Sequence, residues 1–246
     1  HSYPLSAANE ALDDLRAAVD EPRSGRLEEL EELARRFVAA RAASDPLTWR
    51  LDRMTRTRAQ TGHRCRLELD NARAREAVLQ AIEGAERSVL LQVYIFKDCD
   101  FTQALAVRLV GRARAGVQVR LLADGLYSGP ELLANSSQAL LKILGQEPGI
   151  EVLAADPIRV ASELEAMRFK QRDHRKLILV DGSRAFVSGR NFADEYYRDL
   201  REQPIGDWTP AERIPWLDAH LELEGPVVAQ AEAAFWTAWQ RAGGSE

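Results

Sequence analysis

The chain has 246 residues, of which 46% are hydrophobic and 29% charged, so it is long enough to bury a sizeable core. Its 33 Lys and Arg residues against 38 Asp and Glu residues give a formal net charge of −5, which argues against a protein that coats DNA but leaves room for a local basic pocket. Two cysteines exclude a disulfide framework and a Cys-based zinc cluster, and the composition fits an intracellular protein. The longest strongly apolar stretch, 89–96, is far shorter than the roughly 20 residues that a membrane span needs.

Residues 1–56 are predicted to form a helical appendage. Within 27–38, apolar side chains recur at the helical period, and Glu and Arg fill the other face. Such a helix can pack on its own domain, on a partner or on a membrane surface. Packing on its own domain is the favoured interpretation, and the acidic start of the polar face argues against a membrane surface.

Residues 57–246 alternate between strand and helix patterns, which is typical of an α/β domain. Strands are predicted at 66–70, 88–96, 117–123, 149–154, 174–181, 184–188 and 219–224, and helices at 71–86, 102–115, 131–144 and 226–241. Asn71 is predicted to cap the first of these helices. The strands 174–181 and 184–188 are predicted to form a hairpin. We therefore expect a mixed β-sheet flanked by helices, preceded by the helical appendage.

The most informative stretch begins at His174. In a strand, alternate side chains share a face and are about 6.6 Å apart, so His174 and Lys176 can both reach one tetrahedral anion. Asp181 falls on the opposite face of a regular strand. It is therefore better suited to fixing the turn, or to a supporting hydrogen bond, than to direct proton transfer.

The hairpin brings Ser188 and Asn191 back towards His174, and Gly189 gives the backbone close access to an oxyanion. An imidazole can attack phosphorus or transfer a proton, while an ammonium and an amide stabilise charge on the phosphoryl oxygens. The stretch has no accompanying carboxylate cluster for a divalent ion. This pattern favours metal-independent phosphoryl chemistry over two-metal hydrolysis, with no cofactor.

The pattern His-x-Lys-x4-Asp, starting at His174 and followed by Gly-x-Asn at 189–191, resembles the signature of the phospholipase D superfamily. In a chain of this composition only about 0.004 matches to the first three positions are expected by chance. The resemblance covers about residues 62–242. Three further stretches resemble the bacterial cardiolipin synthase-like branch in particular: 191–196, 216–218, and 224–228 with the helix that follows.

This resemblance implies a two-step reaction through a covalent phosphohistidine. It places the nucleophile at His174, with Lys176 and Asn191 holding the phosphoryl oxygens. Asp194 or Glu195 would orient the imidazole, again by resemblance. A second histidine protonates the leaving alcohol, and water or another alcohol then resolves the intermediate.

The family's site takes two such motifs, and this sequence holds one. His63 and His220 have no lysine two residues further on, and His220 is predicted to be a packed or surface histidine. We expect the second motif from the other half of a longer chain, which the chain length favours, or from another protomer. The function hypothesis is a phosphodiesterase or phosphatidyltransferase of the cardiolipin synthase type, acting on phospholipid. The alternatives are a nuclease-type phosphodiesterase built by a homodimer, and a non-catalytic pairing module.

Several properties stay open at the level of sequence. They include the substrate, the choice of water or alcohol as acceptor, the native length and the oligomeric state. These residues show no signal-peptide pattern, and whether a signal or a membrane anchor precedes His1 stays open as well. We expect a cytoplasmic protein or one peripheral to the inner membrane. Basic residues at 168, 170, 172, 175 and 176 predict a basic pocket mouth that suits a lipid head group or a nucleic-acid backbone equally.

Overall fold

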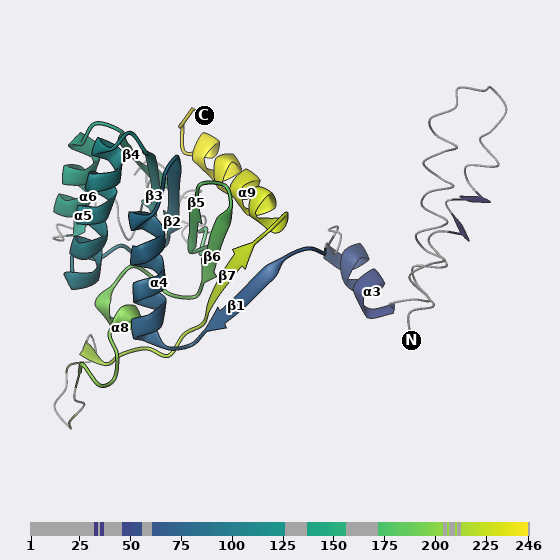
Figure 1. Cartoon of the computed structure of the whole chain (residues 1–246), viewed down its shortest axis with the longest axis horizontal. Coiled ribbons are helices and arrows are strands. Elements are labelled where there is room, and N and C mark those ends of the chain that lie inside the picture. Colours follow the sequence, from purple (N-terminus) through teal and green to yellow (C-terminus); the bar gives the residue numbers. More distant parts are fainter. Residues whose placement is uncertain are drawn as a thin grey trace, which may run out of the picture. The chain divides into compact units, whose positions relative to one another are not determined.

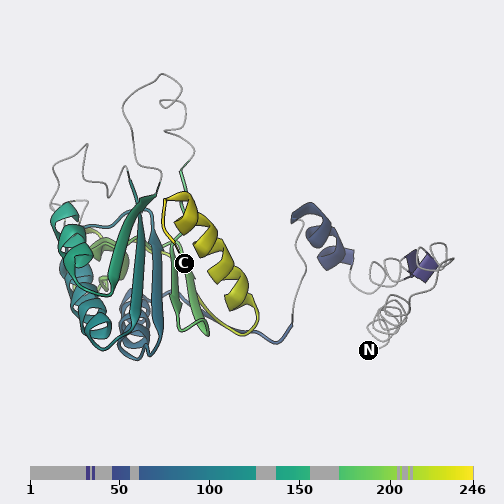
Figure 2. The same ribbon diagram turned by 90° about the horizontal axis from the view of Figure 1, so that it is seen from above.

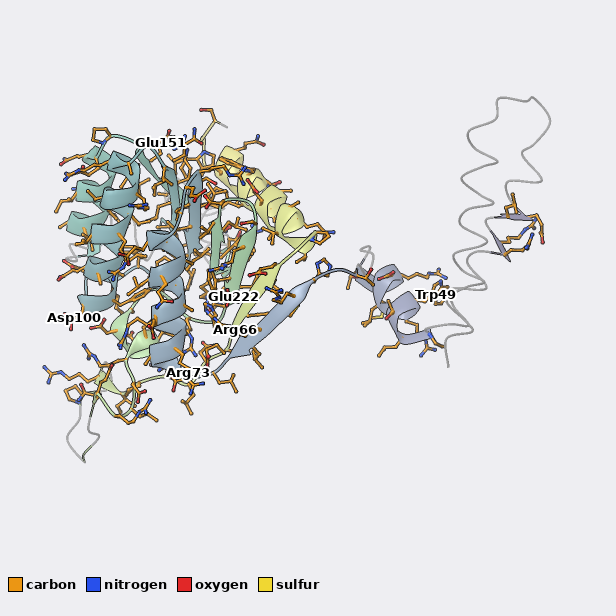
Figure 3. All side chains as sticks on the ribbon, viewed as in Figure 1. Trp49, Arg66, Arg73, Asp100, Glu151 and Glu222 are labelled. Atoms are coloured by element: carbon orange, nitrogen blue, oxygen red, sulfur yellow. The ribbon has the colours of Figure 1, made fainter. Side chains whose placement is uncertain are left out.

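The computed structural model describes residues 32–33, 35–36, 46–55, 61–125, 137–155, 172–203, 206, 210 and 213–245. The chain divides into two units, His1–Thr61 and Gly62–Glu246. In the first unit, α3 (Pro46–Thr55) carries Trp49, over whose ring the guanidinium of Arg53 lies at 4.8 Å (Figure 3). The predicted amphipathic helix at 27–38 lies mostly outside the described residues.

The second unit is built on a mixed sheet (Figure 1). Its strands are β1 (Arg64–Glu68), β2 (Ser88–Val93), β3 (Gln118–Asp124), β4 (Ile150–Ala155), β5 (Leu177–Val180), β6 (Arg184–Ser188) and β7 (His220–Glu224). They lie in the order β1-β7-β6-β5-β2-β3-β4. β2, β3 and β4 run parallel to one another. The pairs β2–β5, β5–β6, β6–β7 and β1–β7 are antiparallel. The predicted fold class is confirmed.

Helices cover both faces of this sheet (Figure 2). One face packs against α4 (Asn71–Glu83), α5 (Asp100–Arg114) and α6 (Ser137–Gln146), and the other against α9 (Val227–Arg241). Side chains of β2 alternate between the two cores, with Leu91 in the first and Leu90 in the second. This explains the continuous apolar run of β2, because both of its faces are buried. None of the described helices is long and apolar enough to cross a bilayer.

Several predicted boundaries needed correction. The carboxylate of Asp70, not the side chain of Asn71, caps α4 by accepting from Arg73 N at 2.9 Å. Asn71 is buried as the first residue of the helix. The first hairpin strand is also shorter than predicted, running Leu177–Val180, because residues 174–176 lie in an irregular segment before it. In the predicted helix 131–144, residues 131–136 lie outside the described chain and α6 begins at 137.

The predicted hairpin between β5 and β6 is confirmed, and Asp181 holds its turn against the start of β2. Asp181 and Gly182 adopt positive φ values of 55° and 63°, which Asp tolerates better than most residues with a β-carbon. The Asp181 carboxylate accepts from the backbone N–H groups of residues 86–88, at 2.7 Å from Arg87. Partial burial opposes the charged form, but these three donors outweigh it and lower the pKa of Asp181.

His220 lies in the core of the sheet, in agreement with the prediction of a packed histidine. Its side chain is 1% exposed, and its ring lies 4.9 Å from that of Phe186. Within the described residues, neither ring nitrogen has a hydrogen-bond partner. Burial, reinforced by the charges of Arg190 and Arg66, lowers the pKa of His220 to about 4. The imidazole is therefore neutral in the folded protein at neutral pH.

This neutral histidine predicts a loss of stability in acid. The unfolded chain takes up a proton below about pH 6.5, whereas the folded chain does so only near pH 4. The free energy of unfolding should therefore fall across this window, by up to about 3 kcal/mol for this group. Urea unfolding measured from pH 7.5 to pH 4 should show a shallower decline for His220→Phe than for the wild type. An unchanged slope in His220→Phe, matching that of the control His63→Gln, would contradict the prediction.

Candidate functional site

The motif lies at the carboxyl ends of the parallel strands. Because β5 runs antiparallel to β2, the residues that precede β5 meet the end of β2. The hairpin ladder reaches back to the motif, since Ser188 N donates to the carbonyl of Lys176 at 3.1 Å. Tyr94 follows β2 directly, and its ring centroid is 4.4 Å from that of His174. This edge is where open α/β sheets usually hold their ligands.

The imidazole of His174 and the ammonium of Lys176 contact one another directly. Lys176 Nζ lies 2.9 Å from Nδ1 and 3.1 Å from Nε2 of His174, and it donates to the His174 carbonyl at 2.8 Å. The same ammonium lies 5.2 Å from the centroid of the Tyr94 ring, a cation–π geometry. Lys176 is 4% exposed, whereas His174 is open to solvent. An anion approaching the imidazole therefore meets the ammonium as well.

Burial and neighbouring charges tune both groups. Burial lowers the pKa of Lys176 to about 8, against the opposing effect of Asp218 and Asp173. Burial and the Lys176 charge lower the pKa of His174, while Asp124 and Asp173 act in the opposite direction. Near neutral pH the site therefore combines a neutral imidazole with a mostly protonated ammonium. This is the pairing that a nitrogen nucleophile and an oxyanion acceptor require.

The segment after β6 closes the site on its other side. Ser188 Oγ donates to the carbonyl of Ala219 at 3.2 Å and accepts from Arg190 N at 3.0 Å. Asn191 is 3% exposed; its Oδ1 accepts from Ile95 N at 3.2 Å. Its Nδ2 donates to the hydroxyl of Tyr196 at 3.0 Å. Ser188 and Asn191 are thus held in place by their own hydrogen bonds.

Gly189 is required by the close approach of Asp218. A β-carbon at position 189 would lie 2.0 Å from Asp218 Oδ1, a distance that real structures do not tolerate. The Gly189 N–H donates to the carbonyl of Ala219 at 3.1 Å. Asp218 was absent from the predicted site residues, although it raises the pKa of Lys176 against the effect of burial. The signal in the sequence was its place in the 216–218 stretch that resembles the cardiolipin synthase-like branch.

Asp194 and Glu195 organise the start of α5. Asp194 Oδ1 accepts from Phe101 N at 2.9 Å, and its other oxygen accepts from Arg198. Glu195 is 8% exposed and pairs with the ammonium of Lys97. Both residues belong to α8 (Asp194–Tyr197). Asp194 therefore lies beside the start of α5, where Asp100 is labelled in Figure 3, and Glu195 lies beside the segment between β2 and α5. That either one orients the His174 imidazole stays a prediction, without support from these contacts.

The predicted basic mouth is largely neutralised where it is described. Arg172 pairs with Asp124 through Nε–Oδ2 at 2.7 Å, and Arg175 pairs with Asp173. Residues 168 and 170 lie outside the described chain. Of the described basic residues in this run, Lys176 is the one that faces the imidazole. In the described chain, no group of three or more His, Cys, Asp or Glu side chains could hold a metal ion.

Comparison with protein families now identifies this arrangement. Residues 78–205 match the family model described as "Cardiolipin synthase, PLD-like domain". The chain belongs to this family. It is 34% identical over 162 residues to cardiolipin synthase 1 of Bacillus anthracis, covering 66% of this chain and 28% of that protein. It is 32% identical over 192 residues to cardiolipin synthase A of Pseudomonas aeruginosa, covering 77% of this chain and 35% of that protein.

The solved structures support the fold of this cardiolipin synthase-like domain. NucT from Helicobacter pylori matches with a TM-score of 0.52 at 14% identity, covering 73% of this chain and 98% of that one. Nuc from Salmonella typhimurium, a phospholipase D family member, matches with a TM-score of 0.51 at 17% identity, covering 73% and 96%. The matches to the two cardiolipin synthases, by contrast, span about a third of their length.

The contact between Gly189 and Asp218 yields a test of the site's packing. Gly189→Ala should displace Asp218 and lower the free energy of unfolding by about 1–3 kcal/mol. It should also lower the pKa of Lys176 further, because the opposing carboxylate moves away. Urea unfolding and NMR titration of the lysine side chains measure the two effects.

Gly111→Ala is the matched control for this substitution. Gly111 lies within α5, and a β-carbon there would meet nothing within 4 Å. It should leave Lys176 unchanged and stabilise the helix by up to about 1 kcal/mol. If Gly189→Ala were as harmless as Gly111→Ala, the proposed packing of Asp218 on the backbone would be wrong.

Proposed function

We propose that this chain is one catalytic half of a phosphatidyltransferase or phosphodiesterase of the cardiolipin synthase type, acting on phospholipid. The observation that carries the proposal is the neutral imidazole of His174 in contact with the buried ammonium of Lys176. The family membership and the identity to two cardiolipin synthases support the substrate class. The proposal covers half a site, because the sequence holds one motif.

In the proposed first step, a ring nitrogen of His174 attacks the phosphorus of the phosphodiester. A P–N bond forms and the P–O bond to the leaving alcohol breaks, and that alcohol takes its proton from a histidine of the second motif. Lys176 balances charge on the phosphoryl oxygens. Asn191, which is held by Ile95 and Tyr196, would add an amide donor by turning one N–H to the substrate. In the second step an acceptor alcohol, or water, attacks phosphorus and gives its proton back to the histidine of the second motif; a P–O bond forms, the P–N bond breaks and His174 is released.

We assign Asp181 a structural part in this scheme. Its carboxylate is engaged by three backbone N–H groups at the far end of β5 from His174. Ser188 and Gly189 shape the wall beside Lys176. Asp218 is a further carboxylate that supports the charge of Lys176.

The second motif would come from the remainder of a longer chain or from another copy. The matched region is about a third of each cardiolipin synthase, which supports the first arrangement. The fold also accounts for nearly all of the Nuc and NucT chains, so chains of one such unit exist. This supports a homodimer as the second arrangement, with a nuclease-type activity as the alternative function.

The proposal predicts that activity depends on His174. The first measurement is the mass of the chain in solution. Two activity assays follow: turnover of bis(p-nitrophenyl) phosphate, and conversion of phosphatidylglycerol in vesicles to cardiolipin and glycerol. The assays use the chain alone and the longest natural protein that contains it. His174→Ala should abolish turnover in whichever of the two proteins is active. With a substrate radiolabelled at phosphorus, the wild type should become labelled through a bond that acid breaks.

Asp181→Ala is the matched control within the same motif. It should lower the free energy of unfolding by about 1 kcal/mol, since the backbone N–H groups of residues 86–88 lose their acceptor, while the turnover of folded protein stays within about twofold. Full activity in His174→Ala would refute the proposal. An active homodimer that cleaves nucleic acid but leaves phosphatidylglycerol unchanged would favour the alternative.

The pKa of Lys176 predicts the alkaline limit of the reaction. Because kcat/KM reports the ionisations of the free enzyme, it should fall as the ammonium loses its proton above about pH 8. On the acid side, kcat/KM should fall as His174 becomes protonated, with a pKa below the ordinary value of histidine. A pH–rate profile of the active particle from pH 5 to pH 10 measures both limbs. A flat profile between pH 8 and pH 10 would show that the charge of Lys176 is not required.

A further inference from the structure

A buried ion pair lies beside the motif. Arg172 Nε is 2.7 Å from Asp124 Oδ2, and the two side chains are 7% and 1% exposed. Asp124 is the last residue of β3, and Arg172 stands two residues before His174. The pair therefore joins the carboxyl end of a central strand to the segment that carries the imidazole.

The guanidinium also reaches the neighbouring strand. Arg172 Nη2 lies 3.4 Å from the carbonyl of Ala155, the last residue of β4. Asp124 and Ala155 are paired in register across the parallel strands, and the Ala155 carbonyl also accepts from Gly125 N at 2.7 Å. One planar side chain thus bridges two adjacent strand ends. A lysine, as a point charge on a flexible stem, would not reproduce this fork.

Stability alone gives a weak reason for such a pair. Desolvation of two buried charges offsets most of their attraction, so an apolar pair of similar size is often as stable. The opposite ends of the same strands carry a more exposed pair, Arg120 with Glu151 at 3.0 Å, whose side chains are 14% and 53% exposed (Figure 3). What distinguishes the Asp124–Arg172 pair is its burial and its place next to the motif.

The pair has direct leverage on His174. Two residues of extended chain span at most about 7 Å, so fixing Arg172 confines the imidazole to a small region. Among the charges that act on the imidazole, Lys176 lowers the pKa of His174, whereas Asp124 and Asp173 raise it. Tyr94 packs against the ring from the end of β2. His174 is therefore contacted by the residue that follows β2, and the chain two residues before it is held to the end of β3.

We propose that Arg172 and Asp124 are positioning residues, which hold the segment carrying His174 against the ends of β3 and β4 so that the imidazole stays between Tyr94 and Lys176. Neither residue is assigned contact with the substrate. The inference rests on the role proposed for His174, but the geometry that it asserts can be measured without any turnover.

The test is NMR titration of selectively labelled histidine in the 246-residue chain, with the His174 resonance assigned through His174→Ala. Asp124→Asn and Arg172→Lys should both raise the pKa of His174 towards its ordinary value, since the ring loses its remaining burial and moves away from Lys176. Both should also reduce the ring-current shift that Tyr94 imposes on the imidazole. In the active particle, Arg172→Lys should lower kcat at least tenfold while KM changes less than twofold.

Glu151→Gln is the control, because it breaks the pair at the other end of the same strands. Circular dichroism and urea unfolding establish that each variant is folded, and Arg172→Lys keeps a charge in place should Asp124→Asn fail to fold. The inference is overturned if folded Arg172→Lys shows the same pKa and the same ring-current shift of His174 as the control Glu151→Gln. It is also overturned if Asp124→Asn lowers that pKa, which would indicate a purely electrostatic role. If the longest natural protein that contains the chain is inactive on phosphodiesters while the 246-residue chain shows the expected NMR changes, the proposed function is refuted but the positioning is not.

Discussion

The guanidinium of Arg190 has no exposed surface, and its two terminal nitrogens need acceptors because a buried charge without partners is costly. It finds them in chain segments that are far apart in sequence: the Asn71 side chain, and the carbonyls of Leu69, Tyr196 and Asp218. These acceptors come from the entry to α4, from α8 and from the irregular segment that precedes β7. Because Arg190 stands between Gly189 and Asn191, the same network fixes the wall of the site. The fold of the second unit and the shape of its site therefore depend on one buried charge.

The mixed sheet converts this fixed wall into a site by bringing strand ends together. β2 ends before Tyr94, β3 ends at Asp124, and β5 begins after Lys176. Because β5 is antiparallel to β2, the motif residues before β5 lie at the carboxyl ends of the parallel strands. Side chains of these three elements then meet within contact distance, as the rings of Tyr94 and His174 do. The hairpin turn at Asp181 anchors the opposite end of β5 to the start of β2. Both ends of a four-residue strand are thus held, which keeps the motif in register with the strand beside it.

Local patterns were sufficient for the fold class, the hairpin and the motif, because periodicity, turn residues and spacing are properties of neighbouring residues. Contacts between distant segments were not accessible in the same way. Asp194 and Glu195 follow Asn191 closely in sequence, but α8 directs their side chains to the start of α5 and to Lys97. Asp218, by contrast, reaches Gly189 from a segment that precedes β7. The capping of α4 shows the same limit on a smaller scale. Asp70 and Asn71 are both good capping residues, and burial of Asn71 among distant carbonyls decides between them.

The charges of the site are arranged so that one cation remains in contact with the imidazole. The arginines that flank the motif are each paired with an aspartate, at 124 and 173, whereas the ammonium of Lys176 is buried against a neutral ring with carboxylates acting on it from further away. Burial leaves that ammonium with a pKa of about 8, so that its protonation is sensitive to a new neighbour. In the proposed reaction a phosphodiester anion is that neighbour, and by linkage it raises the pKa of Lys176 while the ammonium strengthens its binding. Desolvation, which lowers the pKa of Lys176, thus makes the protonation of this ammonium sensitive to the binding of an anionic substrate.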